Sequence, residues 1–128
     1  MKKLFLYIIL LLANTADAQS WTTISTNLWS NYYSCSFGSA TTVYVVGDSL
    51  INTRGIIMKS VDAGLTFHPI NSSAFSSIGT ELLSVYFTSA DTGFVGGGVY
   101  TPTSPPSYGN GFIYRTVDGG TRDRKSVV

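Results

Sequence analysis

The chain has 128 residues and a formal net charge of +1 at pH 7, with 44% hydrophobic and 12% charged residues. Five of its eight lysines and arginines lie near the two ends, so residues 19–121 carry three basic and five acidic side chains, a net charge of −2. This segment gives nucleic-acid binding no electrostatic support, because such binding depends on basic side chains that neutralise phosphates. The single cysteine, Cys35, excludes an intrachain disulfide framework.

The first 18 residues have the three parts of a secretory signal peptide. Two lysines precede an apolar run over residues 4–13, and Ala16-Asp17-Ala18 has the pattern of a signal-peptidase site. The run of ten residues is half the length that a membrane-spanning helix needs, roughly 20 residues. We therefore expect cleavage after Ala18, a secreted, extracellular or periplasmic location, and no stable membrane span after cleavage.

Short runs of β-branched and aromatic residues follow, separated by Gly, Ser, Asn and Asp clusters, which is typical of strands and their turns. Upstream of them, residues 21–24 match residues 67–70 in an aromatic and an isoleucine position, so Trp21 is expected to end a further copy of the repeat whose beginning lies elsewhere. The runs themselves predict four strands, over 33–37, 42–46, 55–60 and 66–70.

The same pattern then recurs. Residues 34–47 align with residues 84–97 at an offset of 50, and seven of the fourteen pairs are identical. From Gly55 the offset becomes 56, and the extra residues fall near the proline-rich stretch 101–107, which cannot continue a strand because proline lacks the ladder N–H. A period near 50 with short strands favours propeller blades over helical solenoids. The second copy predicts three strands, over 83–88, 92–97 and 111–116, and lacks the fourth.

Two copies of one short phrase close the third strand of each repeat: Ser60-Val61-Asp62-Ala63-Gly64-Leu65-Thr66-Phe67 and Thr116-Val117-Asp118-Gly119-Gly120-Thr121. An aspartate in a tight turn accepts hydrogen bonds from nearby backbone N–H groups, and Ser or Thr hydroxyls bond the same loop. Glycine supplies positive φ angles. We expect structural turns built by Ser60, Asp62, Gly64, Thr66, Phe67, Thr116, Asp118 and Gly120.

The alternative roles for Asp62, a catalytic acid or a calcium ligand, are less favoured. A calcium loop of the EF-hand type needs several oxygen side chains, and a glycosidase needs a second carboxylate, which neither phrase supplies. His68, the only histidine, has no metal-ligand spacing around it. Cys35 aligns with Val85, so we expect a small buried apolar role for its side chain. The sequence predicts no catalytic residue, no metal site and no cofactor.

The phrase resembles the Asp-box, or BNR-like, repeat Ser/Thr-x-Asp-x-Gly-x-Thr-Trp/Phe, which occurs once per blade in β-propellers. Residues 87–97, followed by residues 116–120, are similar to the photosystem II assembly/stability factor-like propeller family. The resemblance implies an all-β fold, a β-propeller fragment of about two four-stranded antiparallel blades. The first blade is expected over about 30–72 and the second, incomplete, over about 80–122. The resemblance also implies that residues 21–25 are the outer strand of a blade supplied by the missing C-terminus. It implies further that the box turns lie away from the ligand-binding face.

Residues 123–128 break these patterns. An Asp-box should continue as Thr-Trp at 122 and 123, but Arg122 is followed by Asp-Arg-Lys-Ser-Val-Val, which matches the translation of a common sequencing-adapter oligonucleotide. We therefore expect residues 19–122 to be a C-terminally truncated propeller fragment and residues 123–128 to be a non-native tail. The alternative is a natural basic tail.

The function that the sequence favours is a secreted or exported, non-catalytic binding or assembly scaffold with an unknown protein or glycan ligand. The alternative is a fragment of a secreted Asp-box glycoside hydrolase, sialidase-like or xyloglucanase-like, whose catalytic residues are missing. A sialidase needs an arginine triad and a Tyr/Glu pair; Arg54 and Arg115 do not form such a set, and the sequence identifies no tyrosine partner for Glu81. Aromatic side chains are the candidate ligand contacts: Trp29, Tyr32, Tyr33, Tyr100 and Tyr108.

Overall fold

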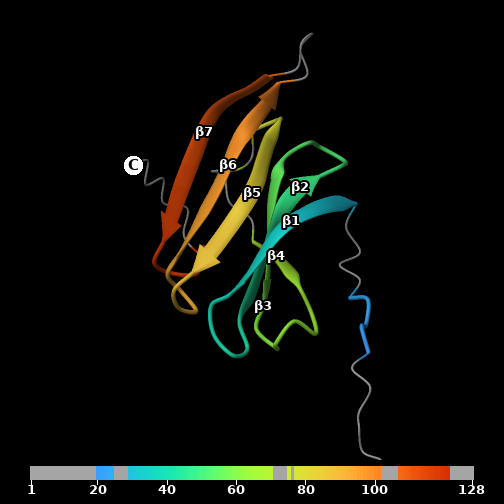
Figure 1. Ribbon diagram of the computed structural model, residues 1–128, viewed down its shortest axis with the longest axis vertical. Coiled ribbons are helices and arrows are strands. Elements are labelled where there is room, and N and C mark those ends of the chain that lie inside the picture. The colour runs from blue at the N-terminus through green and yellow to red at the C-terminus, as the bar shows by residue number, and fades with distance from the viewer. Residues whose placement is uncertain (1–19, 25–28, 71–74, 76, 102–106, 122–128) are drawn as a thin grey trace, which may run out of the picture.

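The computed structural model describes residues 20–24, 29–70, 75, 77–101 and 107–121, which form two antiparallel sheets (Figure 1). The predicted signal peptide 1–18 and the predicted tail 123–128 lie outside the described residues. The first sheet has the order β1 (Ser30–Phe37), β2 (Val43–Ser49), β3 (Gly55–Ser60) and β4 (His68–Ile70). The second has the order β5 (Thr80–Phe87), β6 (Gly93–Thr101) and β7 (Ser107–Thr116).

The all-β prediction is confirmed, with differences at the strand ends. β4 begins at His68 rather than at residue 66, because Thr66 is bonded to Asp62 in the preceding turn. β6 and β7 reach further than predicted and pair out to Thr101 and Ser107. Among the described residues no strand follows β7, and residues 20–24 form none, so the outer strand that the resemblance implies over 21–25 has no partner strand in the described part of the chain.

The two sheets lie beside each other with β1 and β5 adjacent and parallel (Figure 1). The Phe87 amide donates a hydrogen bond to Ser36 Oγ at 2.9 Å, and the Val85 amide donates one to Ser34 Oγ at 3.4 Å. The donors are two residues apart in β5 and the acceptors are two residues apart, in the same order, in β1, so the two strands run in the same direction. Equivalent ends of the two repeats therefore lie at the same end of the molecule.

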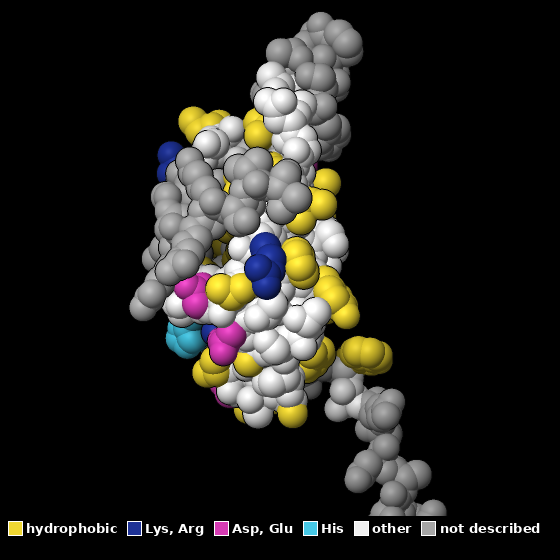
Figure 2. All heavy atoms as spheres, turned by 90° about the vertical axis from the view of Figure 1, so that its left-hand side faces the viewer, with side chains coloured by type: hydrophobic (Ala, Val, Ile, Leu, Met, Phe, Trp, Pro, Cys, Tyr) yellow, Lys and Arg dark blue, Asp and Glu magenta, His cyan; other side chains and the backbone are white. Residues whose placement is uncertain are grey.

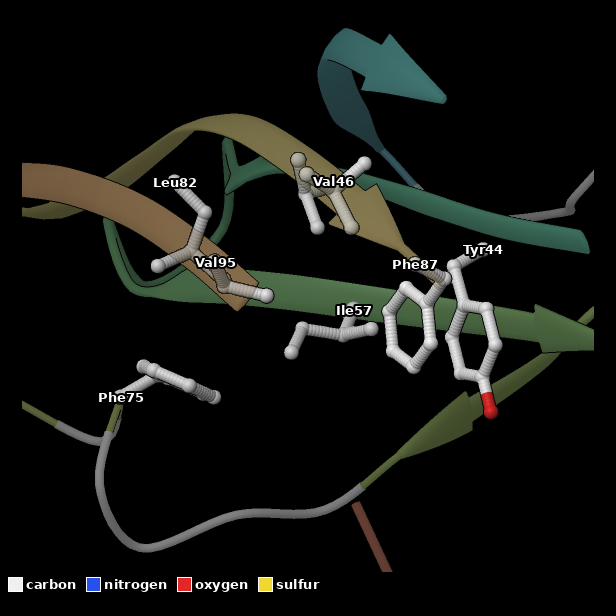
Figure 3. Close-up of a cluster of buried hydrophobic side chains, with 8 residues drawn as sticks. Tyr44, Val46, Ile57, Phe75, Leu82, Phe87 and Val95 are labelled. Atoms are coloured by element: carbon white, nitrogen blue, oxygen red, sulfur yellow. The ribbon is translucent and has the colours of Figure 1, made fainter. Parts of the chain in front are cut away.

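The main hydrophobic cluster lies between the sheets, and Val43 and Met58 are buried on the other face of the first sheet. Alternation along the strands sends one set of apolar side chains from each sheet to the shared interface. The rings of Tyr44 and Phe87 stack with their centroids 3.6 Å apart and an interplanar angle of 2° (Figure 3). The buried cluster comprises Tyr44, Val46 and Ile57 from the first sheet, Leu82, Val85, Phe87 and Val95 from the second, and Phe75 from the connection.

The inference that Cys35 is buried, drawn from its alignment with Val85, is wrong. Cys35 is exposed, whereas Val85 is in the core. β1 turns Ser34 and Ser36 toward the second sheet, so the alternate side chains Cys35 and Phe37 point to the opposite side. Cys35 and Phe37 are exposed at the β1 edge of that face, whereas Val43 and Met58 on the same face are buried.

A bulge recurs at the start of each repeat and explains a shared glycine. The register slips at Tyr33 in β1 and at Leu83 in β5. Each slip pushes a carbonyl oxygen toward the neighbouring strand, so a Cβ on Gly97 would collide with the Glu81 oxygen and one on Gly47 with the Asn31 oxygen. Glycine is therefore required at both positions by the close approach of two backbones.

We expect Gly97→Ala to destabilise the second sheet by about 1–3 kcal/mol, the usual cost of overpacking. The matched control is Gly96→Ala, where the added Cβ meets only the Phe112 oxygen at 3.9 Å; that change should stay within about 0.5 kcal/mol. Limited proteolysis of β5 and β6 measures the difference. Equal protease resistance of the two variants would contradict the account.

Candidate functional site

The first aspartate turn, residues 60–66, is held by hydrogen bonds to the side chains of Ser60 and Asp62. Ser60 Oγ donates to Asp62 Oδ1 at 2.6 Å and accepts the Gly64 amide at 2.9 Å. The other carboxylate bonds come from Thr66, whose amide reaches Oδ1 at 2.9 Å and whose hydroxyl reaches Oδ2 at 2.6 Å. Both oxygens of Asp62 are thus engaged by its own turn.

The second aspartate turn, residues 116–121, repeats this arrangement. Thr116 Oγ1 donates to Asp118 Oδ1 at 3.0 Å and accepts the Gly120 amide at 2.9 Å. The hydroxyl of Thr121 donates to the Asp118 backbone oxygen at 2.8 Å. The two turns differ in the acceptor of the threonine hydroxyl. In the first turn Thr66 donates to the carboxylate of Asp62, whereas in the second Thr121 donates to the backbone oxygen of Asp118.

Each aspartate turn is tied to the neighbouring β1–β2 or β5–β6 turn of its own sheet. The Ala63 amide donates to the Thr41 oxygen and the Gly119 amide to the Asp91 oxygen, both at 2.8 Å. These residues have positive φ angles of 61° and 65°, and Gly64 and Gly120 follow with 90° and 77°. The paired left-handed residues close both turns in the same way.

The hydrogen bonds of the first turn lower the pKa of Asp62 well below its ordinary value of 3.8. The Ser60 hydroxyl is the largest cause, followed by the hydroxyl and the amide of Thr66. Donors to a carboxylate stabilise the charged form. Asp62 is therefore held ionised as an acceptor, which does not suit a proton donor.

The opposite end of the sheets carries two exposed aromatic side chains, Trp29 and Tyr33. We call it the aromatic end, defined by Trp29, Tyr33, Asp48, Glu81 and Tyr100. β1 and β5 start there and β2 and β6 finish there, whereas β3 and β7 start at this end and finish at the opposite end, where the aspartate turns follow them (Figure 1). The structure therefore separates the turns from the aromatic end by the length of the strands.

Tyr33, Asp48 and Glu81 interact at the aromatic end. A hydrogen bond to the Asp48 carboxylate is the largest cause that raises the pKa of Tyr33 to about 12, and burial and the charges of Asp48 and Glu81 add to it. Burial raises the pKa of Glu81, and the negative charge of Asp48 raises it further. Asn31 Nδ2 donates to Asp48 Oδ1 at 3.4 Å. The group thus combines a phenol, an amide and two carboxylates on three strands.

Backbone hydrogen bonds gather exposed apolar side chains around this group. The Leu50 amide donates to the Trp29 oxygen at 2.9 Å, and Trp29 is 75% exposed. The Gly79 amide donates to the Thr53 oxygen at 2.6 Å, and the Tyr100 amide to the Gly79 oxygen at 2.7 Å. These bonds bring the β2–β3 turn of the first sheet to the start of β5, which places three exposed aliphatic residues there: Leu50, Ile51 and Ile78.

The predicted aromatic residues therefore fall together in part. Trp29 and Tyr33 are exposed, and Tyr32 and Tyr100 are half-buried at the same end. The side chain of Tyr108 lies outside the described part of the structure. Sequence reasoning did not identify Asp48 as part of this site, and it did not pair Glu81 with Tyr33. It also missed the three exposed aliphatic residues, because no local sequence pattern marks any of these positions.

The described part of the chain contains no group of three or more His, Cys, Asp or Glu residues that could hold a metal ion. Within that part there is also no helix that could cross a membrane.

Two neighbouring antiparallel sheets, four strands and three, with parallel adjacent first strands, define β-propeller blades. A solved structure described as "YCF48 bound to D1 peptide" is similar to this chain, with a TM-score of 0.59 and 23% identity. The match covers 83% of this chain and 29% of that chain, so this chain spans less than a third of its length. The likeness shows the propeller fold. No protein-family model and no curated protein matches the chain.

The depressed pKa of Asp62 has a direct test. The folded pKa lies below the ordinary 3.8, so the contribution of the carboxylate to the turn is complete above that value and is lost as the pH falls through the folded pKa. A ¹³C NMR titration of Asp62 should show an ionised carboxylate well below pH 3.8. Ser60→Ala, which removes the largest cause, should raise the pKa toward 3.8.

Thr66→Val is the second variant, because Ser60→Ala also removes a bond to the Gly64 amide. It should raise the pKa of Asp62 while leaving the Ser60 hydroxyl in place. A wild-type midpoint near 3.8, or a midpoint that neither variant changes, would contradict the assignment of the shift to these hydrogen bonds.

Proposed function

We propose that the chain consists of Asp-box blades of a secreted or exported, non-catalytic β-propeller that binds an extended segment of a partner protein. The aromatic end is the proposed binding surface. The observation that carries this proposal is the gathering of exposed apolar side chains around the Tyr33, Asp48 and Glu81 group, at the end remote from both aspartate turns. The signal peptide proposed for residues 1–18 accounts for export.

The chemistry of the surface favours a peptide with apolar side chains and a basic residue. Trp29 and Tyr33 present rings that gain affinity from apolar contact at low entropic cost. The negative charge of Asp48 lies close enough to raise the pKa of Glu81, and a lysine or arginine beside the two carboxylates would relieve this repulsion. A neutral glycan would bring no positive charge to this acidic pair, so a peptide with a basic residue is the better ligand.

The similarity to YCF48 supports a protein partner. The description of that structure names a bound D1 peptide, so a propeller of similar fold accommodates a peptide ligand. In this chain the Asp-box turns would serve as scaffold, since both oxygens of Asp62 are already bonded within the turn.

One observation favours the second candidate, a glycoside hydrolase. Tyr33 and Glu81 interact electrostatically, so Glu81 does have a nearby tyrosine, and its raised pKa would suit a general acid. The described residues at this end include a single arginine, Arg54, where a sialidase would need three. The binding scaffold is therefore the favoured function.

The proposal is tested by fluorescence anisotropy with labelled 15-residue peptides that carry two leucines and a phenylalanine around a central residue. Peptides with a central lysine or arginine should bind, and the same peptides with a central glutamate should bind more weakly. Trp29→Ala and Tyr33→Ala should each weaken binding at least about tenfold, as truncation of an aromatic anchor typically does. Glu81→Gln should reduce the preference for the basic peptides.

The matched control is Leu65→Ala, an exposed apolar residue of the first aspartate turn. It should leave peptide binding unchanged. The proposal fails if Leu65→Ala weakens binding as much as Trp29→Ala, or if no member of the series binds. Release of 4-methylumbelliferone from a fluorogenic glycoside, abolished by Glu81→Gln, would instead support the hydrolase.

A further inference from the structure

One turn at the aromatic end has a strained backbone. Thr53, between β2 and β3, has a φ of 49°. A β-branched residue seldom adopts this left-handed conformation, because its branched side chain crowds the backbone. The other described residues with positive φ are glycines, one alanine and one asparagine. Strain of this kind persists only where surrounding contacts enforce it, and it is common at ligand-binding sites.

Backbone hydrogen bonds enforce the conformation of Thr53. Its amide donates to the Ser49 oxygen at 2.9 Å, and the Ser49 amide donates to the Arg54 oxygen at 2.8 Å, so the turn is closed on itself. The Thr53 oxygen accepts the Gly79 amide at 2.6 Å, from the residue that precedes β5. The strained turn of the first sheet is therefore fixed to the second sheet.

The residue that makes this link differs from its counterpart in the other repeat. Gly79 aligns with Trp29 at the offset of 50, and the oxygens of both accept equivalent amides, from Tyr100 and Leu50. Gly79 has a φ of 81°, and a Cβ there would collide with the Tyr100 oxygen. The link thus requires glycine at a position where the first repeat carries a large exposed ring.

The linked turn presents aliphatic side chains to solvent. Leu50 is 54% exposed, Ile51 is 76% exposed, and Ile78, next to Gly79, is 72% exposed. The hydrogen bond between Gly79 and Thr53 brings Ile78 to the turn that carries the other two. Figure 2 shows hydrophobic side chains beside a basic side chain near the upper left, at the end of the molecule where this turn lies. We call Leu50, Ile51 and Ile78 the aliphatic group.

The aliphatic group lies beyond the two carboxylates of the aromatic end. Leu50 and Ile51 follow Asp48 by two and three residues, and Ile78 precedes Glu81 by three. Consecutive Cα atoms are about 3.8 Å apart, so the Cα atom of each aliphatic residue lies within roughly 11 Å of that of an acidic residue. In an extended peptide, residues two apart point to the same side and lie roughly 7 Å apart. A bound segment can therefore place a basic side chain at the carboxylates and a second side chain, two residues away, at the aliphatic group.

We propose that the aliphatic group is a subsite for a branched aliphatic side chain two residues from the basic residue of the bound segment, and that Gly79 is the positioning residue of this subsite. The inference rests on the proposed function of the aromatic end and specifies its ligand. The pattern is lysine or arginine, any residue, then leucine, isoleucine or valine, in either direction along the segment. Because the turn is already fixed by its hydrogen bonds, binding does not have to order it, which favours affinity.

The subsite is tested by fluorescence anisotropy with the full chain and 15-residue peptides that keep the phenylalanine and the central lysine of the series above and carry one leucine. A leucine two residues from the lysine should bind at least about fivefold more tightly than an alanine there, because more apolar surface is buried. A leucine next to the lysine points to the other side and should give no such gain. Ile51→Ala and Ile78→Ala should each remove most of the gain and leave the preference for lysine over glutamate unchanged.

Gly79→Ala tests the positioning role, with Gly109→Ala as the matched control, because a Cβ at Gly109 meets no atom within 4 Å. Gly79→Ala should lose the gain from leucine and keep the preference for lysine, whereas a general loss of structure would remove both. Gly109→Ala should keep both. If far-UV circular dichroism shows that Gly79→Ala does not fold, hydrogen exchange at the Gly79 amide of the wild type decides: slow exchange supports the role and rapid exchange overturns it.

The outcomes separate this inference from the proposed function. Equal binding of the peptides with leucine at the two spacings, or an undiminished gain in both isoleucine variants, overturns the subsite, while a retained preference for lysine leaves the proposed function standing. An undiminished gain in a folded Gly79→Ala variant overturns the positioning role. If no peptide of the series binds, the proposed function itself fails and the subsite fails with it.

Discussion

The structure depends on one contact, the packing of one face of the second sheet on one face of the first. The main buried apolar cluster draws its members from both sheets, and Val43 and Met58 are buried on the far face of the first sheet. The Tyr44 and Phe87 stack lies within this cluster, and the parallel alignment of β1 with β5 follows from the same contact. In repeat architectures each unit buries its face against a neighbour. This interface therefore determines where the aspartate turns and the residues of the aromatic end lie relative to one another.

The aspartate turns and the aromatic end are consequences of that alignment. Since the first strands run in the same direction, both turns come to one end and the starts of β1 and β5 to the other. The turns satisfy their own polar groups through Ser60, Asp62 and Thr66 and need little from the core. The aromatic end, by contrast, holds carboxylates whose neighbours come from different strands. Groups with shifted pKa values are common at functional sites, so ligand binding is expected at this end.

Much of the fold could be predicted from the sequence because the signals were local and repeated. The runs of β-branched and aromatic residues predicted all seven strands. The cause of the repeated glycine at 47 and 97, a bulge that drives a carbonyl toward the glycine, became evident only in the structure. The interaction of Tyr33, Asp48 and Glu81 could not be predicted, since it depends on the register across two sheets. The burial inferred for Cys35 was wrong because equivalence between repeats does not guarantee an equivalent neighbour.

The most direct test of the account is a double-mutant cycle between Tyr44 and Phe87, read by hydrogen exchange at the amides of β2 and β5. If the two sheets share one core, Tyr44→Leu and Phe87→Leu should be non-additive by about 0.5–1.5 kcal/mol, the range for aromatic pairs, and each change should reduce the protection of both strands. Additive effects, each confined to the sheet that carries the substitution, would contradict the account.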